Sequence, residues 1–118
     1  MAEEILRGIL DRWKAGVDAH QPQQVAALFT EDAIFQGLRP YSVGRQGVSD
    51  YYESQPRGMT VAYRVLETRQ PADDVVLGFV DAAFSFDDGS TVDVDLGVLI
   101  KSTPDGWFID HYQVSRLA

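Results

Sequence analysis

The spacing between apolar residues changes near Thr60, and this change constrains the fold more than any other feature of the chain. Before it, apolar residues recur every three or four positions, which predicts an amphipathic helix; they are Ile5, Leu6, Ile9, Leu10, Trp13 and Val17. After it the period is two, which predicts strands over 61–69, 75–86, 91–101 and 107–115. Helices followed by a run of strands are typical of an α+β domain with its helices on one face of a sheet.

Turn and helix-starting residues divide the chain further. Pro22 suits the first turn of a short second helix, and the pattern predicts helices over 23–29 and 47–54, with an extended segment over 33–36 and a loop over 37–44 between them. Asp88-Gly89 and Pro104-Asp105-Gly106 predict tight turns, so the last three strands should form an antiparallel meander. No repeat or linker is visible, and residues 1–118 are interpreted as one domain.

Composition excludes several classes of function. The 18 acidic and 10 basic residues give a net charge of -8, which repels nucleic acid and anionic membrane surfaces. The chain has no cysteine, and it carries neither a phosphate-binding loop nor a dinucleotide glycine pattern, so we expect no cofactor. No signal peptide and no apolar run long enough to span a bilayer are visible, so a cytoplasmic location is the default expectation.

Four segments carry a resemblance to a known superfamily. They are 25–35 (VAALFTEDAIF), 44–48 (GRQGV), Tyr51-Tyr52 and 106–109 (GWFI). In this order and spacing, over nearly the whole chain, they resemble the nuclear transport factor 2-like superfamily, and within it the SnoaL-like and SgcJ/EcaC-type small proteins related to the ketosteroid isomerase fold. The resemblance implies a cystatin-like roll: a cone-shaped, curved antiparallel sheet with three N-terminal helices on its concave face, around an apolar cavity. It also implies a homodimer formed through the sheet face.

The same resemblance argues against an ordinary ketosteroid isomerase. Aligning the chain on that enzyme's pattern places Trp13 where an oxyanion-hole tyrosine would be and Gly37 where the base would be. The strand acid would fall within 96–98, which contains no acidic residue. An indole donates weakly and glycine cannot accept a proton, so that mechanism lacks its groups.

His111 is the candidate catalytic residue. Strict alternation along the last strand places it on one face with Trp107, Ile109 and Gln113, and by resemblance that face lines the cavity. An imidazole there can act as a general acid or base near neutral pH, with Gln113 as a neighbouring ligand-binding group. The alternative is a hydrogen-bonded histidine within a mixed core.

The remaining candidate ligand-binding residues are aromatic or lie near the expected mouth of the cavity. They are Trp13, Phe35, Tyr41, Arg45 and Tyr52. Aromatic rings also dominate ordinary cores, so core packing is the competing interpretation for most of them. Arg45 has two alternatives of its own, since it can bond local carbonyl groups or pair with Asp50.

The paired acids Asp93 and Asp95 lie opposite the apolar residues of the same strand and should face outward. We interpret them as part of a solvated or dimer-forming sheet face, and we expect no metal site because only two ligands are evident.

Three hypotheses of function remain open. The first is binding of a small, largely apolar and possibly polycyclic or aromatic molecule, with isomerase- or cyclase-type acid–base chemistry by His111 in secondary or lipid metabolism. The second is ligand binding without catalysis, and the third is a homo-association module. A hollow filled by the chain's own side chains would favour the third.

Overall fold

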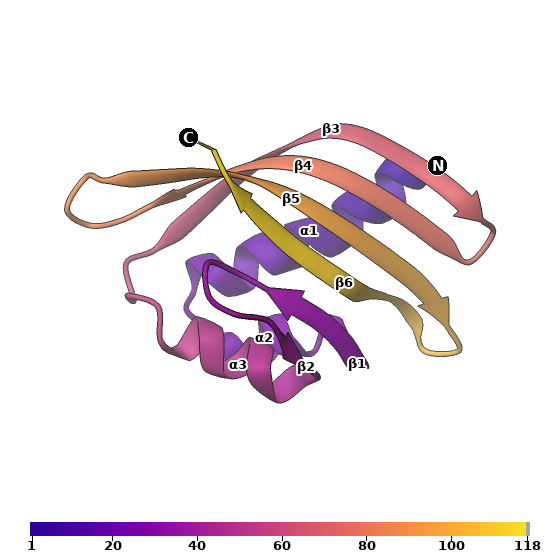
Figure 1. Ribbon diagram of the computed structural model, residues 1–118, viewed down its shortest axis with the longest axis horizontal. Coiled ribbons are helices and arrows are strands. Elements are labelled where there is room, and N and C mark those ends of the chain that lie inside the picture. The colour runs from indigo at the N-terminus through magenta and orange to yellow at the C-terminus, as the bar shows by residue number, and fades with distance from the viewer. Residues whose placement is uncertain (118) are drawn as a thin grey trace.

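Three helices lie against one face of a curved, six-stranded sheet in a computed structural model that describes residues 1–117 (Figure 1). The helices are α1 (Ala2–Asp18), α2 (Pro22–Ala26) and α3 (Arg45–Glu53). The strands are β1 (Phe29–Gln36), β2 (Ser42–Val43), β3 (Thr60–Ala72), β4 (Val75–Ser85), β5 (Thr91–Thr103) and β6 (Gly106–Arg116). The predicted α+β class is confirmed, and all three helices precede the four strands β3 to β6.

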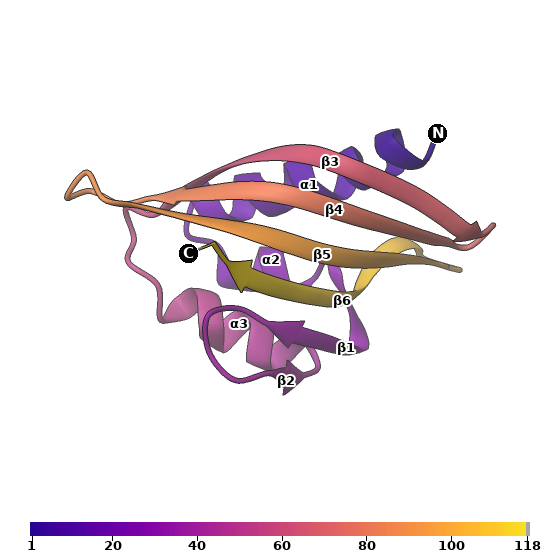
Figure 2. The same ribbon diagram turned by 45° about the horizontal axis from the view of Figure 1, so that its top comes forward.

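The sheet has the strand order β2-β1-β6-β5-β4-β3 and does not close into a barrel. Strands β3 to β6 pair as a continuous antiparallel meander, as the turn signals predict. Strand β1 joins β6 in parallel, and the two-residue β2 adds the outermost antiparallel edge within the loop predicted over 37–44. Figure 2 shows the helices gathered beneath the sheet, so one face is covered by the chain itself.

Helix α1 forms the main cover of the inner face. Leu6, Ile9, Leu10, Trp13 and Val17 are all buried on its inner side, as their spacing predicts. The contact with β4 is close, because a Cβ atom added at Gly78 would lie 2.5 Å from a methyl group of Leu6. Only glycine at this position lets the helix and the strand approach so far.

The second helix is shorter than its apolar spacing predicts. It ends at Ala26, whereas the prediction extends it over 23–29. The backbone N–H of Ile109 donates to the carbonyl of Leu28 at 2.8 Å, and Phe29 pairs with Ile109 in the parallel ladder. Pairing with β6 therefore draws these residues into β1, because a tertiary hydrogen-bond ladder outweighs local helical spacing.

A bulge in β6 changes which residues face inward. Ile100 of β5 pairs with Ile109, whereas the preceding Leu99 pairs with His111, so Asp110 is an extra residue in β6. Ile109 and Tyr112 both point inward and are 0% and 1% exposed. The prediction that His111 shares a face with Ile109 is wrong, because one inserted residue reverses the alternation that follows it.

Strand β5 has no such irregularity, and its prediction is confirmed. Val94, Leu96 and Val98 are fully buried, while Asp93 and Asp95 lie on the opposite face. Regular alternation thus predicts side-chain direction correctly where every residue of a strand is paired.

Candidate functional site

The space between α1 and the sheet is filled by the chain's own buried side chains, with aromatic rings grouped around Trp13. Trp13 lies in the middle of this filling, with no exposed surface. Its ring centre is 6.5 Å from that of Tyr63, 6.1 Å from that of Phe84 and 6.2 Å from that of Tyr112. These edge-on and tilted contacts are favourable aromatic geometries, so the rings pack closely around Trp13.

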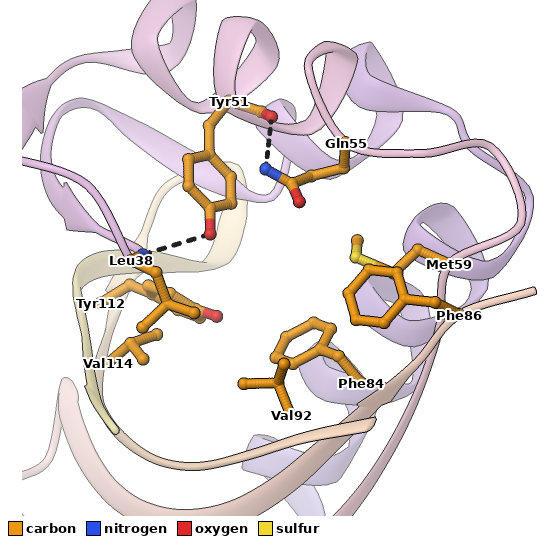
Figure 3. A pocket seen from close by; sticks show the side chains of 9 residues that line it. All are labelled: Leu38, Tyr51, Gln55, Met59, Phe84, Phe86, Val92, Tyr112 and Val114. Carbon is orange, nitrogen blue, oxygen red and sulfur yellow. Dashed lines mark hydrogen bonds between the residues drawn. The ribbon is translucent and has the colours of Figure 1, made fainter. Parts of the chain in front are cut away.

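A small cavity remains at one end of this filling, between α3 and the ends of β4, β5 and β6 (Figure 3). Its lining residues are Leu38, Tyr51, Gln55, Met59, Phe84, Phe86, Val92, Tyr112 and Val114. The centre of a water-sized sphere can occupy about 40 Å³ of it. Since about 10–15 Å³ on this measure accommodates one water, the cavity has room for a few waters before any side chain moves.

The polar groups of the cavity are few and come from α3, the segment that follows it, and β6. The Tyr51 hydroxyl accepts a hydrogen bond from the backbone N–H of Leu38 at 3.2 Å, and the Gln55 amide donates to the Tyr51 carbonyl at 3.4 Å. Figure 3 shows the Tyr112 hydroxyl directed toward the space between these side chains. An apolar wall with a few convergent polar groups is typical of a small-molecule site.

The Tyr112 hydroxyl is linked to two groups behind the cavity wall. The Trp13 Nε1–H donates to the Tyr52 hydroxyl at 3.0 Å, and the Tyr52 hydroxyl donates to that of Tyr112 at 3.5 Å. Burial raises the pKa of both phenols well above the ordinary value, because a phenolate would lose its hydration there. Both tyrosines therefore stay protonated at neutral pH.

The candidate ligand-binding residues from the sequence lie at different depths. Trp13 and Tyr52 lie behind the cavity wall, and Phe35 stacks on Tyr112 with ring centres 4.9 Å apart. Phe35 also borders a more open groove on the α3 side, together with Tyr51. Tyr41 is 67% exposed and is not among the residues that line the cavity.

Arg45 lies outside the cavity as well. Its Nε donates to the backbone carbonyl of Phe29 at 2.7 Å, which is the carbonyl-bonding alternative considered above. This bond ties the start of α3 to the start of β1, so the guanidinium holds two elements together.

His111 and Gln113 lie on the outer face of the sheet because of the bulge at Asp110. His111 is partly buried there, between Leu99 of β5 and Ile34 of β1, and Gln113 is exposed. This placement separates the candidate imidazole from the cavity by the thickness of the sheet.

The outer face carries a row of apolar side chains around His111. Pairing between strands places Val43, Ile34, His111, Leu99 and Leu77 side by side across the sheet. Val43, Ile34 and Leu77 are 60%, 45% and 41% exposed, and Phe79 in the next row is 46% exposed. An exposed apolar patch of this kind marks a surface suited to association.

Within residues 1–117, no three His, Asp or Glu side chains are grouped so that they could hold a metal ion. In the same part of the chain, no helix combines the length and apolar character needed to cross a bilayer.

Two signals in the sequence indicate residues that line the cavity but are not among the predicted ligand-binding residues. Phe86 and Val92 flank the Asp88-Gly89 turn and are brought together by it. In β6 the inward apolar residues Ile109, Tyr112 and Val114 are separated by three and then two positions, which is the spacing that a bulge produces. Leu38, Gln55 and Met59 lie on connecting segments and have no comparable signal.

Comparison with solved structures identifies the fold. An NTF2-like protein with a cystatin-like fold from Novosphingobium aromaticivorans matches with a TM-score of 0.81 and 14% identity, over 98% of this chain and 81% of that chain. A ketosteroid isomerase-like protein from Erwinia carotovora atroseptica matches at 0.77 and 18%, over 98% and 95%. A protein from Xanthomonas campestris described as a calcium/calmodulin dependent protein kinase II association domain matches at 0.80 and 16%, over 95% and 85%.

These matches confirm the resemblance at the level of the fold, which is nuclear transport factor 2-like and cystatin-like. Identities below 20% show the fold alone and leave the activity open. No known family profile matches the chain, and no curated protein matches its sequence.

Proposed function

We propose that the protein binds a small, neutral and largely apolar molecule in the cavity between α3 and the ends of β4, β5 and β6. The observation that carries this proposal is the lining of the cavity, where six apolar side chains surround two tyrosines and one glutamine. Burial of apolar surface supplies affinity, and the few polar groups orient the ligand. The net charge of -8 disfavours anionic ligands.

A ligand larger than a few waters requires the cavity to widen. Met59 and Leu38 are suited to this movement, because the thioether side chain of methionine is flexible and Leu38 is 47% exposed on the segment between β1 and β2. Leu38 lies outside the buried core, whereas Met59 is 5% exposed and belongs to the core where it borders the cavity. The ligand is therefore expected to enter between α3 and the β4–β5 turn, with movement of these two side chains.

Binding without a proton-transfer step fits the lining better than acid–base catalysis. Among the lining residues there is no carboxylate, imidazole or amine. Burial raises the pKa of Tyr112 well above the ordinary value, so this phenol stays protonated near pH 7 and cannot act as a base. The isomerase- or cyclase-type chemistry expected for His111 is not part of this proposal, because the imidazole lies on the other side of the sheet.

A cavity-filling variant tests the proposal. Val92→Phe places a ring in the cavity wall, and Thr91→Phe places the same ring on the neighbouring exposed position of β5. Binding of the neutral fluorescent probe N-phenyl-1-naphthylamine is measured by titration. We expect Val92→Phe to weaken binding at least about tenfold and Thr91→Phe to change it less than about twofold.

The proposal fails if the wild-type protein does not bind the probe, or if both variants bind as tightly as wild type. Thermal unfolding of each variant checks that the protein is folded during the titration.

A second candidate function is association of two copies through the outer face of the sheet. The exposed row formed by Val43, Ile34 and Leu77, with Phe79 beside it, favours this candidate. The similar structure described as an association domain is consistent with self-association on this fold. The two candidates use opposite faces of the sheet, so one protein can have both properties.

A further inference from the structure

The hydrogen bonds behind the cavity wall have a fixed direction. An indole N–H can donate a hydrogen bond and cannot accept one. The Trp13 Nε1–H therefore donates to the oxygen of Tyr52 at 3.0 Å, and the hydrogen of Tyr52 must point elsewhere. The oxygen of Tyr112 at 3.5 Å is its acceptor, so both bonds run from Trp13 toward the cavity.

This direction determines what Tyr112 can do. Its oxygen accepts from Tyr52, and within residues 1–117 its hydroxyl makes no other hydrogen bond. Its own hydrogen is therefore left for a group outside the protein. The side chain is 1% exposed, and its hydroxyl is directed into the cavity (Figure 3). A nearly buried donor without a protein acceptor favours a ligand that supplies one.

We propose that the Tyr112 hydroxyl donates a hydrogen bond to an uncharged acceptor oxygen of the ligand, so that the cavity prefers apolar ketones or related carbonyl compounds over hydrocarbons of the same shape. This inference rests on the proposed function of the cavity and specifies its ligand class. The bond from Tyr52 polarises the Tyr112 hydroxyl and makes it a better donor.

Tyr51 provides an internal contrast. Its hydroxyl also accepts a hydrogen bond, from the Leu38 backbone, and also has a free hydrogen. The Tyr51 side chain is only partly buried, so water can take that hydrogen when no ligand is present. A ligand oxygen that replaces water gains little there, whereas at Tyr112 it satisfies a donor that solvent reaches poorly.

The test compares two probes of the same skeleton, 1-indanone and indane, by isothermal titration of wild type, Tyr112→Phe and Tyr51→Phe. The measured quantity is the ratio of the two dissociation constants, indane over 1-indanone. Indane leaves water more readily than the ketone, but this difference is the same for all three proteins. A change in the ratio between proteins therefore reports a change in the hydrogen bond to the ketone. We expect Tyr112→Phe to lower this ratio about tenfold, and Tyr51→Phe to lower it less than about twofold.

The outcomes separate this inference from the proposal beneath it. An unchanged ratio in Tyr112→Phe, with both probes bound, overturns the role of Tyr112 and leaves the apolar cavity in place. Absence of binding of either probe to wild type overturns both.

Infrared spectroscopy of the bound ketone tests the contribution of Tyr52. The carbonyl stretch of 1-indanone shifts to lower frequency when it accepts a hydrogen bond. We expect the largest shift with wild type, a smaller shift with Tyr52→Phe and none with Tyr112→Phe. A purely structural role of Tyr52 would leave the frequency in the bound state unchanged, and that result would remove the polarising step.

Discussion

The two faces of the sheet are built from similar apolar side chains but have different surroundings. On the inner face, which the helices cover, Val94, Leu96 and Val98 are fully buried. On the outer face, Leu77 and Phe79 keep 41% and 46% of their surface exposed. Alternation along a strand thus supplies apolar groups to both faces, and the helices cover one of them. The inner face holds the buried core and borders the proposed ligand site, and the outer face carries the exposed apolar side chains proposed for association.

Trp13→Ala should produce the largest effect, because it removes the centre of the inner packing. The side chain is completely buried and donates a hydrogen bond to Tyr52. Loss of a buried tryptophan typically lowers the free energy of unfolding by about 3–5 kcal/mol. Urea denaturation measures this change. Tyr41→Ala, at a side chain that is 67% exposed, should change it by less than about 0.5 kcal/mol.

Equal losses in the two variants would contradict the comparison of the faces, because the inner packing would then contribute no more than an exposed ring. A small loss in Trp13→Ala alone would indicate that the space around the indole collapses or fills with water.

Phe79→Lys tests the outer face. If two copies associate through the exposed apolar row, a buried ammonium group beside that row weakens association by at least about tenfold, because burying an unpaired charge is unfavourable. Sedimentation equilibrium measures the dissociation constant. Gln24→Lys adds the same charge on α2, away from the sheet, and should leave association unchanged.

A wild-type protein that stays monomeric at high concentration would remove association as a candidate function. Free energies of unfolding of both lysine variants should remain close to that of wild type, since both sites are exposed.

The sequence predicts the elements of this fold better than it predicts the site. Periodicity and turn residues give the strands of the meander, because each depends on neighbours close in the chain. The end of α2 and the bulge at Asp110 depend instead on how β6 pairs with β1 and β5. The bulge of one residue places His111 outward, where strict alternation predicts it inward, and places Tyr112 inward.

The extent of the cavity could not be predicted for a related reason. Trp13, Phe84 and Tyr112 are all inward aromatic residues, but Trp13 fills the interior while Phe84 and Tyr112 also border the cavity. Whether a ring fills the interior or lines the cavity depends on packing distances of a fraction of an ångström. Residue type and spacing contain no measure of these distances.

Substitution of Tyr63, on the edge strand β3, should have a smaller effect on the free energy of unfolding, and this effect should depend on pH. Burial, with a further contribution from its hydrogen bond to Asp11, raises the pKa of Tyr63 to about 12. The folded protein holds this proton more tightly than the unfolded chain. Its contribution to stability is therefore complete below the ordinary pKa of about 10 and is lost as the pH rises toward 12.

Urea denaturation between pH 9 and 12 compares wild type with Tyr63→Phe. Wild type should lose stability more steeply than the variant across this interval, and Tyr41→Phe should follow wild type. Parallel curves for wild type and Tyr63→Phe would show that the folded state does not hold the Tyr63 proton more tightly.

His111→Gln should produce the smallest effect, and it tests the register on which the whole comparison of the faces depends. His111 lies outward and Tyr112 inward because Asp110 is unpaired. The substitution should change the free energy of unfolding by less than about 0.5 kcal/mol, measured below the concentration at which copies associate. Binding of N-phenyl-1-naphthylamine should stay within about twofold of wild type. A clear loss of binding would mean that the strand alternates without a bulge, with the imidazole in the cavity and Tyr112 outside, and the ligand class inferred from Tyr112 would then lose its basis.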